Sequence, residues 1–226
     1  MRTLRIAAPQ PDPRAACIVL LPGAWQEPED FLRAGFDRAI ALHALAIELV
    51  LVAPELRHVA DRDWIAELLV RVLQPVRAAG RALWLGGISL GGFLALCCAA
   101  RHPELADGLC LIAPYLGNRL VAAEVAAQGG LRTWDSGDPG EEDDERLVWR
   151  YLQRLGAPPP ALFLGLGSDD RFAAIHRLLA EALPAGSTQV LPGGHDWPVW
   201  RQLWDNFLDR YAAAHAQPQA PSSRPA

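Results

Sequence analysis

Short apolar runs alternate along the chain with longer segments of helical spacing. Most of the runs are continuous, which is the pattern of strands buried on both faces. Because parallel strands are joined by crossover connections, this alternation predicts an α/β fold with a mostly parallel central sheet and helices on both faces. The runs lie at 17–21, 47–53, 82–85, 109–113, 161–166 and 188–191.

The segment 64–76 shows the helical pattern most clearly. Apolar residues at every fourth position from Trp64 to Val76 fall on one helical face, whereas Arg71 and Gln74 point elsewhere. Near the C-terminus, aromatic residues from Trp197 to Tyr211 recur at alternating steps of three and four positions, which also fall on one helical face. We expect this last helix to pack its aromatic face against the sheet.

The composition predicts a single domain over residues 1–214, because no change in composition divides it. Two segments differ from the rest. Residues 118–160 contain a stretch rich in Gly, Asp and Glu and end in three prolines, which predicts a short lid or insertion. Residues 215–226 are rich in Pro, Ala and Ser, and we expect a disordered tail.

Charge and cysteine content exclude several classes of partner. The formal net charge is −5 and the arginines are scattered, so a nucleic-acid partner is not expected. The four cysteines show no C-x-x-C spacing, which favours buried, reduced thiols over a metal site or disulfides.

The N-terminal residues lack the apolar core of a signal peptide. No apolar run approaches the ~20 residues that span a bilayer. We therefore expect a soluble cytoplasmic protein with no membrane partner.

The segment Gly87-Ile88-Ser89-Leu90-Gly91 carries the clearest chemical signal. An apolar strand leads into it and a helical run follows, so Ser89 is expected at the tip of a strained strand-to-helix turn. Side chains two residues before and after such a serine would collide, which explains the glycines. The N–H groups of the new helix would point toward charge that develops beside Ser89. The alternative is a glycine-rich turn that only packs a helix close to a strand.

With this motif the chain resembles the alpha/beta hydrolase superfamily over nearly its whole length, in particular small bacterial-type serine esterases and thioesterases. The resemblance implies the order nucleophile, acid, histidine. It places the acid three residues after the strand-end Gly167, at Asp170, with the neighbouring Asp169 as the alternative. His195, in a glycine loop after the last predicted strand, would be the histidine. The other five histidines are interpreted as structural.

The resemblance also implies an oxyanion hole made of backbone N–H groups. One would come from Ala24 or Trp25 in the loop after the first predicted strand, and the other from Leu90. Pro22-Gly23 stands where a common family pattern has His-Gly, and a plain strand-end turn is the alternative.

Eight tryptophans in 226 residues are many. Trp25, Trp134 and Trp149 lie in the expected oxyanion loop and lid. We expect them to line a substrate pocket for an apolar or aromatic acyl or alcohol group.

Together these features predict a serine hydrolase that cleaves carboxylic esters of small or medium acyl groups through an acyl-Ser89 intermediate, without cofactor or metal. A thioesterase or acyltransferase would use the same residues. A binding module that keeps the fold without turnover is a third possibility.

Overall fold

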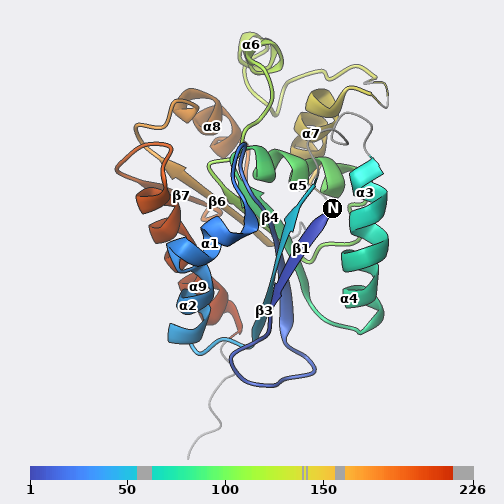
Figure 1. The fold of residues 1–226 in the computed structure, drawn as a ribbon. Coiled ribbons are helices and arrows are strands. Elements are labelled where there is room, and N and C mark those ends of the chain that lie inside the picture. Colours follow the sequence, from blue (N-terminus) through green and yellow to red (C-terminus); the bar gives the residue numbers. More distant parts are fainter. Residues whose placement is uncertain (55–62, 139, 141, 156–160, 216–226) are drawn as a thin grey trace, which may run out of the picture.

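A seven-stranded sheet forms the centre of the computed structural model, which describes residues 1–54, 63–138, 140, 142–155 and 161–215 (Figure 1). The strand order is β1-β3-β2-β4-β5-β6-β7. The first strand is antiparallel to β3 and all other pairs are parallel. The strands are β1 (Arg2–Ile6), β2 (Ala16–Leu21), β3 (Ile47–Ala53), β4 (Leu83–Ile88), β5 (Gly108–Ile112), β6 (Ala161–Gly167) and β7 (Thr188–Leu191).

All six predicted runs are strands of this sheet. The runs at 47–53 and 188–191 coincide with β3 and β7, and the other four differ only at their ends. The strand β1 was not predicted. It is an edge strand with partly exposed side chains, so it lacks the continuous apolar run of the buried strands.

Helices cover both faces of the sheet, as predicted (Figure 1). One face carries α1 (Pro28–Ala34), α2 (Phe36–Leu42) and α9 (Trp197–His215), whose apolar side chains share one core cluster with the sheet. The second cluster, on the other face, takes in α3 (Asp63–Leu68), η2 (Leu69–Leu73), α4 (Gln74–Ala78), α5 (Leu90–Arg101), α7 (Asp144–Gln153) and α8 (Ala173–Ala180).

The predicted helical face at 64–76 is buried, but the backbone is not one regular helix. Between α3 and α4 the π-helical segment η2 widens the coil. Trp64, Leu68, Val72 and Val76 all face the core, whereas Arg71 binds Glu67 at the surface.

The aromatic face of α9 packs on the sheet as predicted. Trp200, Trp204, Phe207 and Tyr211 are buried. The ring of Trp204 stacks on Phe36 with ring centroids 4.9 Å apart, and its Nε1–H donates to the Phe36 carbonyl at 3.1 Å. Contacts of Trp204 therefore hold α2 against α9, which itself packs on the sheet.

The segment between β5 and β6 carries α6 (Arg119–Ala127) and α7. The second of these helices packs on α5 through Val148, Trp149 and Leu152. In contrast, α6 lies beyond the carboxyl edge of the sheet (Figure 1). A lid role for residues 118–160 stays a prediction, and residues 156–160 lie outside the described part.

The remaining predictions about the chain bear on its ends, its cysteines and the membrane. The helix α9 continues through His215, and the rest of the predicted tail lies outside the described residues. All four cysteines are buried and free, as expected. Among the described residues, no helix has the length and apolar character needed to cross a bilayer.

Candidate active site

Ser89 stands between β4 and α5 with its backbone at φ 52°, in the left-handed region that non-glycine residues rarely adopt. The flanking glycines make this turn possible. A Cβ on Gly87 would lie 2.5 Å from the Leu21 carbonyl oxygen, and one on Gly91 would lie 1.9 Å from the same atom. The steric reason given for the G-x-S-x-G motif therefore holds in the structure.

Ser89, His195 and Asp170 form a continuous hydrogen-bonded chain. The His195 Nε2 lies 2.9 Å from the Ser89 Oγ, and its Nδ1 lies 2.7 Å from the Asp170 Oδ2. The three residues follow β4, β7 and β6, so the carboxyl edge of the parallel sheet brings together residues that are far apart in sequence.

The structure places Asp170, and not Asp169, against the histidine. The Asp169 Oδ2 accepts a hydrogen bond from the Gly193 amide at 3.2 Å and so ties the two loops together. Gly167 permits this close approach, since a Cβ there would lie 2.4 Å from the Gly193 carbonyl oxygen.

The electrostatics of Asp170 keep it ionised. Burial of this side chain would raise the pKa of its carboxyl. Hydrogen bonds from the His195 ring and from the Phe172 amide outweigh burial and hold that pKa below its usual value. Asp170 is therefore a fixed negative charge beside His195 Nδ1.

Two aromatic rings contact the imidazole of His195. The rings of Phe172 and Trp200 meet it edge-on, with centroids 5.3 Å and 5.0 Å away. Such contacts restrict rotation of the imidazole and leave its Nε2 directed at Ser89.

Of the predicted oxyanion donors, Leu90 directly follows Ser89, and Trp25 lines the same cavity as Leu90. Leu90 is the first residue of α5, so its N–H has no acceptor within the helix. Ala24 and Trp25 donate their main-chain N–H groups to no described residue, whereas the N–H of Gly23 binds the side chain of Gln26 at 2.8 Å. These free donors suit a developing negative charge.

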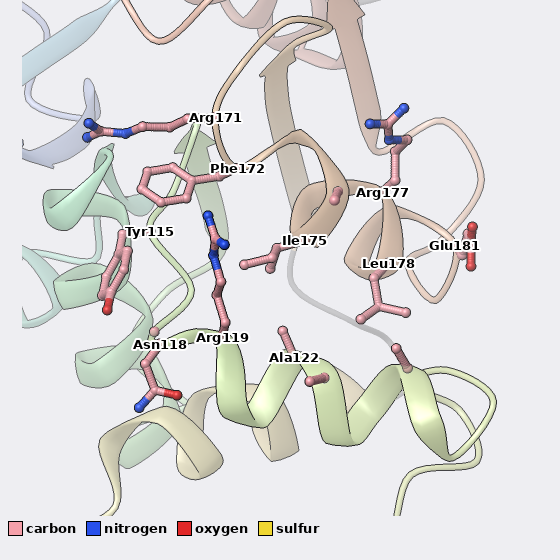
Figure 2. Close-up of a pocket in the computed structure, with 14 residues that line it drawn as sticks. Tyr115, Asn118, Arg119, Ala122, Arg171, Phe172, Ile175, Arg177, Leu178 and Glu181 are labelled. Carbon is pink, nitrogen blue, oxygen red and sulfur yellow. The ribbon is translucent and has the colours of Figure 1, made fainter.

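Two cavities adjoin the site. The first, of about 870 Å³, lies between α6 and α8 and includes Tyr115 and Phe172 (Figure 2). The second, of about 630 Å³, includes Trp25 and Leu90. Trp25 is 92% exposed and has a φ of 62°, so its indole is presented to solvent by a strained loop.

Trp134 and Trp149 line neither of these two cavities, so the expectation that they form a substrate pocket finds no support there. Each indole is buried in the packing of the insertion. The Trp134 Nε1–H donates to Glu124 at 3.1 Å, and the Trp149 Nε1–H donates to the Leu116 carbonyl at 2.9 Å. Both rings therefore hold the insertion together.

Sequence reasoning missed Tyr115 and Phe172, which form the wall between the first cavity and the triad. The Tyr115 amide donates to the Ser89 carbonyl at 2.9 Å, and its ring meets that of Phe172. Their positions in the sequence could have indicated that they lie near the site. Tyr115 follows the end of β5, and Phe172 lies two residues after the expected acid.

His43, His102 and His215 lie in or at the ends of helices away from the triad, and His58 lies outside the described residues. His176 is completely buried, and its Nε2 lies 2.8 Å from the Pro114 carbonyl oxygen. Within the described residues no three His, Cys, Asp or Glu side chains are grouped to hold a metal ion.

The fold and this site agree with the comparison to protein families. The chain belongs to the alpha/beta hydrolase family, which it matches over residues 18–224. The predicted fold class is thereby confirmed. No curated protein matches the sequence.

Solved structures show the same fold at low sequence identity. Est1E from Butyrivibrio proteoclasticus, with ferulic acid bound, has a TM-score of 0.67 at 10% identity and covers 94% of each chain. FphF, a fluorophosphonate-binding serine hydrolase of Staphylococcus aureus, has a TM-score of 0.61 at 15% identity, over 90% of this chain and 86% of its own. A monoacylglycerol lipase of Paleococcus ferrophilus has a TM-score of 0.60 at 15% identity, over 95% and 99%.

Proposed function

We propose that this protein is a serine hydrolase that cleaves carboxylic esters of small or medium acyl groups through an acyl-Ser89 intermediate. The observation that carries the proposal is the chain of hydrogen bonds from Ser89 Oγ through His195 to Asp170, at 2.9 Å and 2.7 Å. A nucleophile, a base and an orienting acid in this geometry are the components of acyl transfer.

The fixed charge of Asp170 sets the tautomer of His195. Its Nδ1–H donates to the carboxylate, which leaves Nε2 as the acceptor for the Ser89 hydroxyl proton. As Ser89 Oγ attacks the ester carbonyl, His195 takes that proton and Asp170 stabilises the resulting imidazolium.

The carbonyl oxygen gains negative charge in this step, and the N–H groups of Leu90 and of Ala24 or Trp25 are proposed to bind it. His195 then donates its proton to the departing alcohol, and the acyl group stays on Ser89. Water, deprotonated by His195, attacks the acyl-enzyme, which releases the acid and restores Ser89.

The two cavities support the proposed substrate size. At about 870 Å³ and 630 Å³ they suit small ligands, and they lie on the Phe172 side and the Trp25 side of the site. Each would accept one substituent of the ester. Trp25 is proposed to cover the substituent in the second cavity.

The first test is hydrolysis of p-nitrophenyl acetate, butyrate and octanoate by the protein and by Ser89→Ala. We expect the substitution to lower kcat/KM by about 10³-fold or more, because the nucleophile is lost. Ser168→Ala is the matched control, since Ser168 is an exposed serine of the neighbouring acid loop whose hydroxyl is outside the triad. Turnover that survives in Ser89→Ala would refute the proposal.

Two further measurements distinguish the related functions. Preference for butyryl-CoA over the matching oxygen ester would indicate a thioesterase or acyltransferase with the same triad. Absence of both turnover and labelling of Ser89 by a fluorophosphonate would favour a binding module on this fold.

A further inference from the structure

The cavity between α6 and α8 differs in charge from the protein as a whole. The chain carries 26 acidic and 21 basic residues. The cavity lining instead contains Arg119, Arg171 and Arg177 against a single carboxylate, Glu181. An excess of positive charge in one cavity of an acidic protein points to an anionic ligand group.

Two of these arginines have uncommitted guanidinium groups. Neither Arg119 nor Arg171 forms a hydrogen bond or ion pair with any described residue, and Arg171 lies over the ring of Phe172 at 4.8 Å. Arg177 differs, since its Nε donates to the Ala173 carbonyl at 3.2 Å. Many other arginines of the described chain are paired with carboxylates, such as Arg81 with Glu48 at 2.6 Å.

The uncommitted arginines lie at the triad end of the cavity. Arg171 directly follows Asp170 in sequence, and Figure 2 shows Arg119 extending from the first turn of α6 toward Phe172. Phe172 in turn contacts the imidazole of His195. Figure 2 shows the Arg171 side chain running away from the space between α6 and α8, on the opposite side of the Phe172 ring from Arg119. A ligand group in this space would therefore meet Arg119 beside Phe172, near the reacting atoms.

Beyond these arginines the cavity is lined by apolar side chains as far as its other end, where Glu181 lies. Ala122 on α6 faces Ile175 and Leu178 on α8, and Glu181 follows the end of α8 (Figure 2). With a helical rise of about 1.5 Å per residue, roughly 13 Å separates Phe172 from Glu181. The cavity thus has a cationic end near Ser89, an apolar middle and an acidic far end.

From this arrangement we infer that the preferred ester carries a carboxylate near its scissile bond, bound by Arg119, and an apolar group that extends between α6 and α8. This inference rests on the proposed function. It narrows the substrate class from esters in general to anionic esters. Carboxylate recognition by a guanidinium group is favoured because it presents several N–H donors in a planar fork.

The test compares two pairs of esters that differ only in charge. For a carboxylate on the acyl side, the pair is mono-4-nitrophenyl adipate and its methyl ester. For a carboxylate on the alcohol side, it is 3-butyryloxybenzoate and its methyl ester. Binding of all four is measured calorimetrically with Ser89→Ala, so the result does not depend on turnover, and kcat/KM is measured with the wild-type protein.

We expect the anionic member of one pair to bind about tenfold more tightly than its neutral partner and to be hydrolysed with a correspondingly higher kcat/KM. The pair that shows the preference identifies the side of the ester that occupies this cavity. Arg119→Gln should bring the anionic-to-neutral ratio to about one, whereas Arg171→Gln, on the other side of the Phe172 ring, should change it far less. Arg201→Gln, at an exposed position of α9, is the matched control and should leave the ratio unchanged.

The outcomes separate this inference from the proposed function. Equal binding of both members in both pairs, or a preference that survives Arg119→Gln, would overturn the inference even if Ser89-dependent hydrolysis is found. A preference that depends on Arg119, with no turnover of any ester, would support the anionic site and refute the hydrolase. Thermal unfolding of the arginine variants shows whether they are folded.

Discussion

Backbone strain at single residues marks the carboxyl edge of the sheet. Four non-glycine residues in the described part of the chain have positive φ, and three of them, Trp25, Ser89 and Ala113, directly follow or lie close after β2, β4 and β5. Only Ala44 lies elsewhere, in the turn before β3. Such conformations cost free energy and persist where the surrounding structure enforces them. Their grouping around Ser89 agrees with the proposal that the nucleophile and the oxyanion loop are fixed before substrate binds.

The two neighbouring aspartates permit a test at the level of one residue. Asp170→Asn removes the charge that stabilises the His195 imidazolium and can impose the wrong tautomer. We expect kcat on a p-nitrophenyl ester to fall by about 10⁴-fold. The measurement is steady-state hydrolysis at neutral pH.

Asp169→Asn is the matched control, because it changes the adjacent acid, which binds the Gly193 amide and not the imidazole. It should cost far less activity than Asp170→Asn. If the two variants lose similar activity, Asp170 does not act through its contact with His195.

At the level of secondary structure, the sequence predicted the strands that are buried on both faces and missed the edge strand. In β1, Arg2 and Arg5 form ion pairs with glutamates, Glu27 and Glu48 among them. Polar side chains on an edge strand remove the continuous apolar run by which the inner strands were identified. Its place depends on pairing with β3, which no local pattern of the N-terminus reveals.

The candidate site was predictable where residues follow strands, and less so elsewhere. Each residue of the triad follows a parallel strand, either directly, as Ser89 does, or after a short loop, as Asp170 and His195 do. The topology of the sheet alone therefore brings the three to one edge. Trp134 and Trp149 belong to the insertion, where packing decides whether a ring faces a cavity or the core. Large aromatic side chains stabilise a small helical insertion most when they are buried, which is where the structure places them.

The strand-to-helix turn at Ser89 yields a prediction for the whole element. Gly91→Ala would place a Cβ 1.9 Å from the Leu21 carbonyl oxygen, a main-chain atom that cannot move without distorting β2. We expect a loss of about 3 kcal/mol or more in the free energy of unfolding, together with loss of esterase activity. Urea unfolding followed by circular dichroism measures the first quantity.

Gly140→Ala serves as the control for Gly91→Ala, because a Cβ there has nothing within 4 Å. It should unfold within about 0.5 kcal/mol of the wild-type protein. A stable, active Gly91→Ala protein would show that the turn does not need a glycine after the serine.

For the molecule as a whole, the sheet order places the candidate site between two differently built halves. The chain leaves β2 toward β3 and then returns on its other side to β4, so α1 and α5 cover opposite faces at this point. Ser89 lies at this switch point, where open α/β sheets bind ligands. The Trp25 cavity is formed by the first half of the chain, and the Arg119 cavity by the second.

The buried His176 couples the stability of this second half to pH. Burial lowers the pKa of its imidazole from the ordinary 6.5, more than its contact with Pro114 and the nearby Asp170 charge raise it. Below about pH 6.5 the unfolded chain therefore binds a proton that the folded protein does not. The free energy of unfolding consequently decreases as the pH is lowered. We expect His176→Gln, whose amide can still donate to the Pro114 carbonyl, to lose less stability than the wild-type protein when the pH is lowered from 7.5 to 5.5, as measured by urea unfolding.

His102→Gln, at the partly exposed end of α5, controls for removal of an imidazole. Parallel pH curves for wild type and His176→Gln would show that this histidine is not held neutral in the fold.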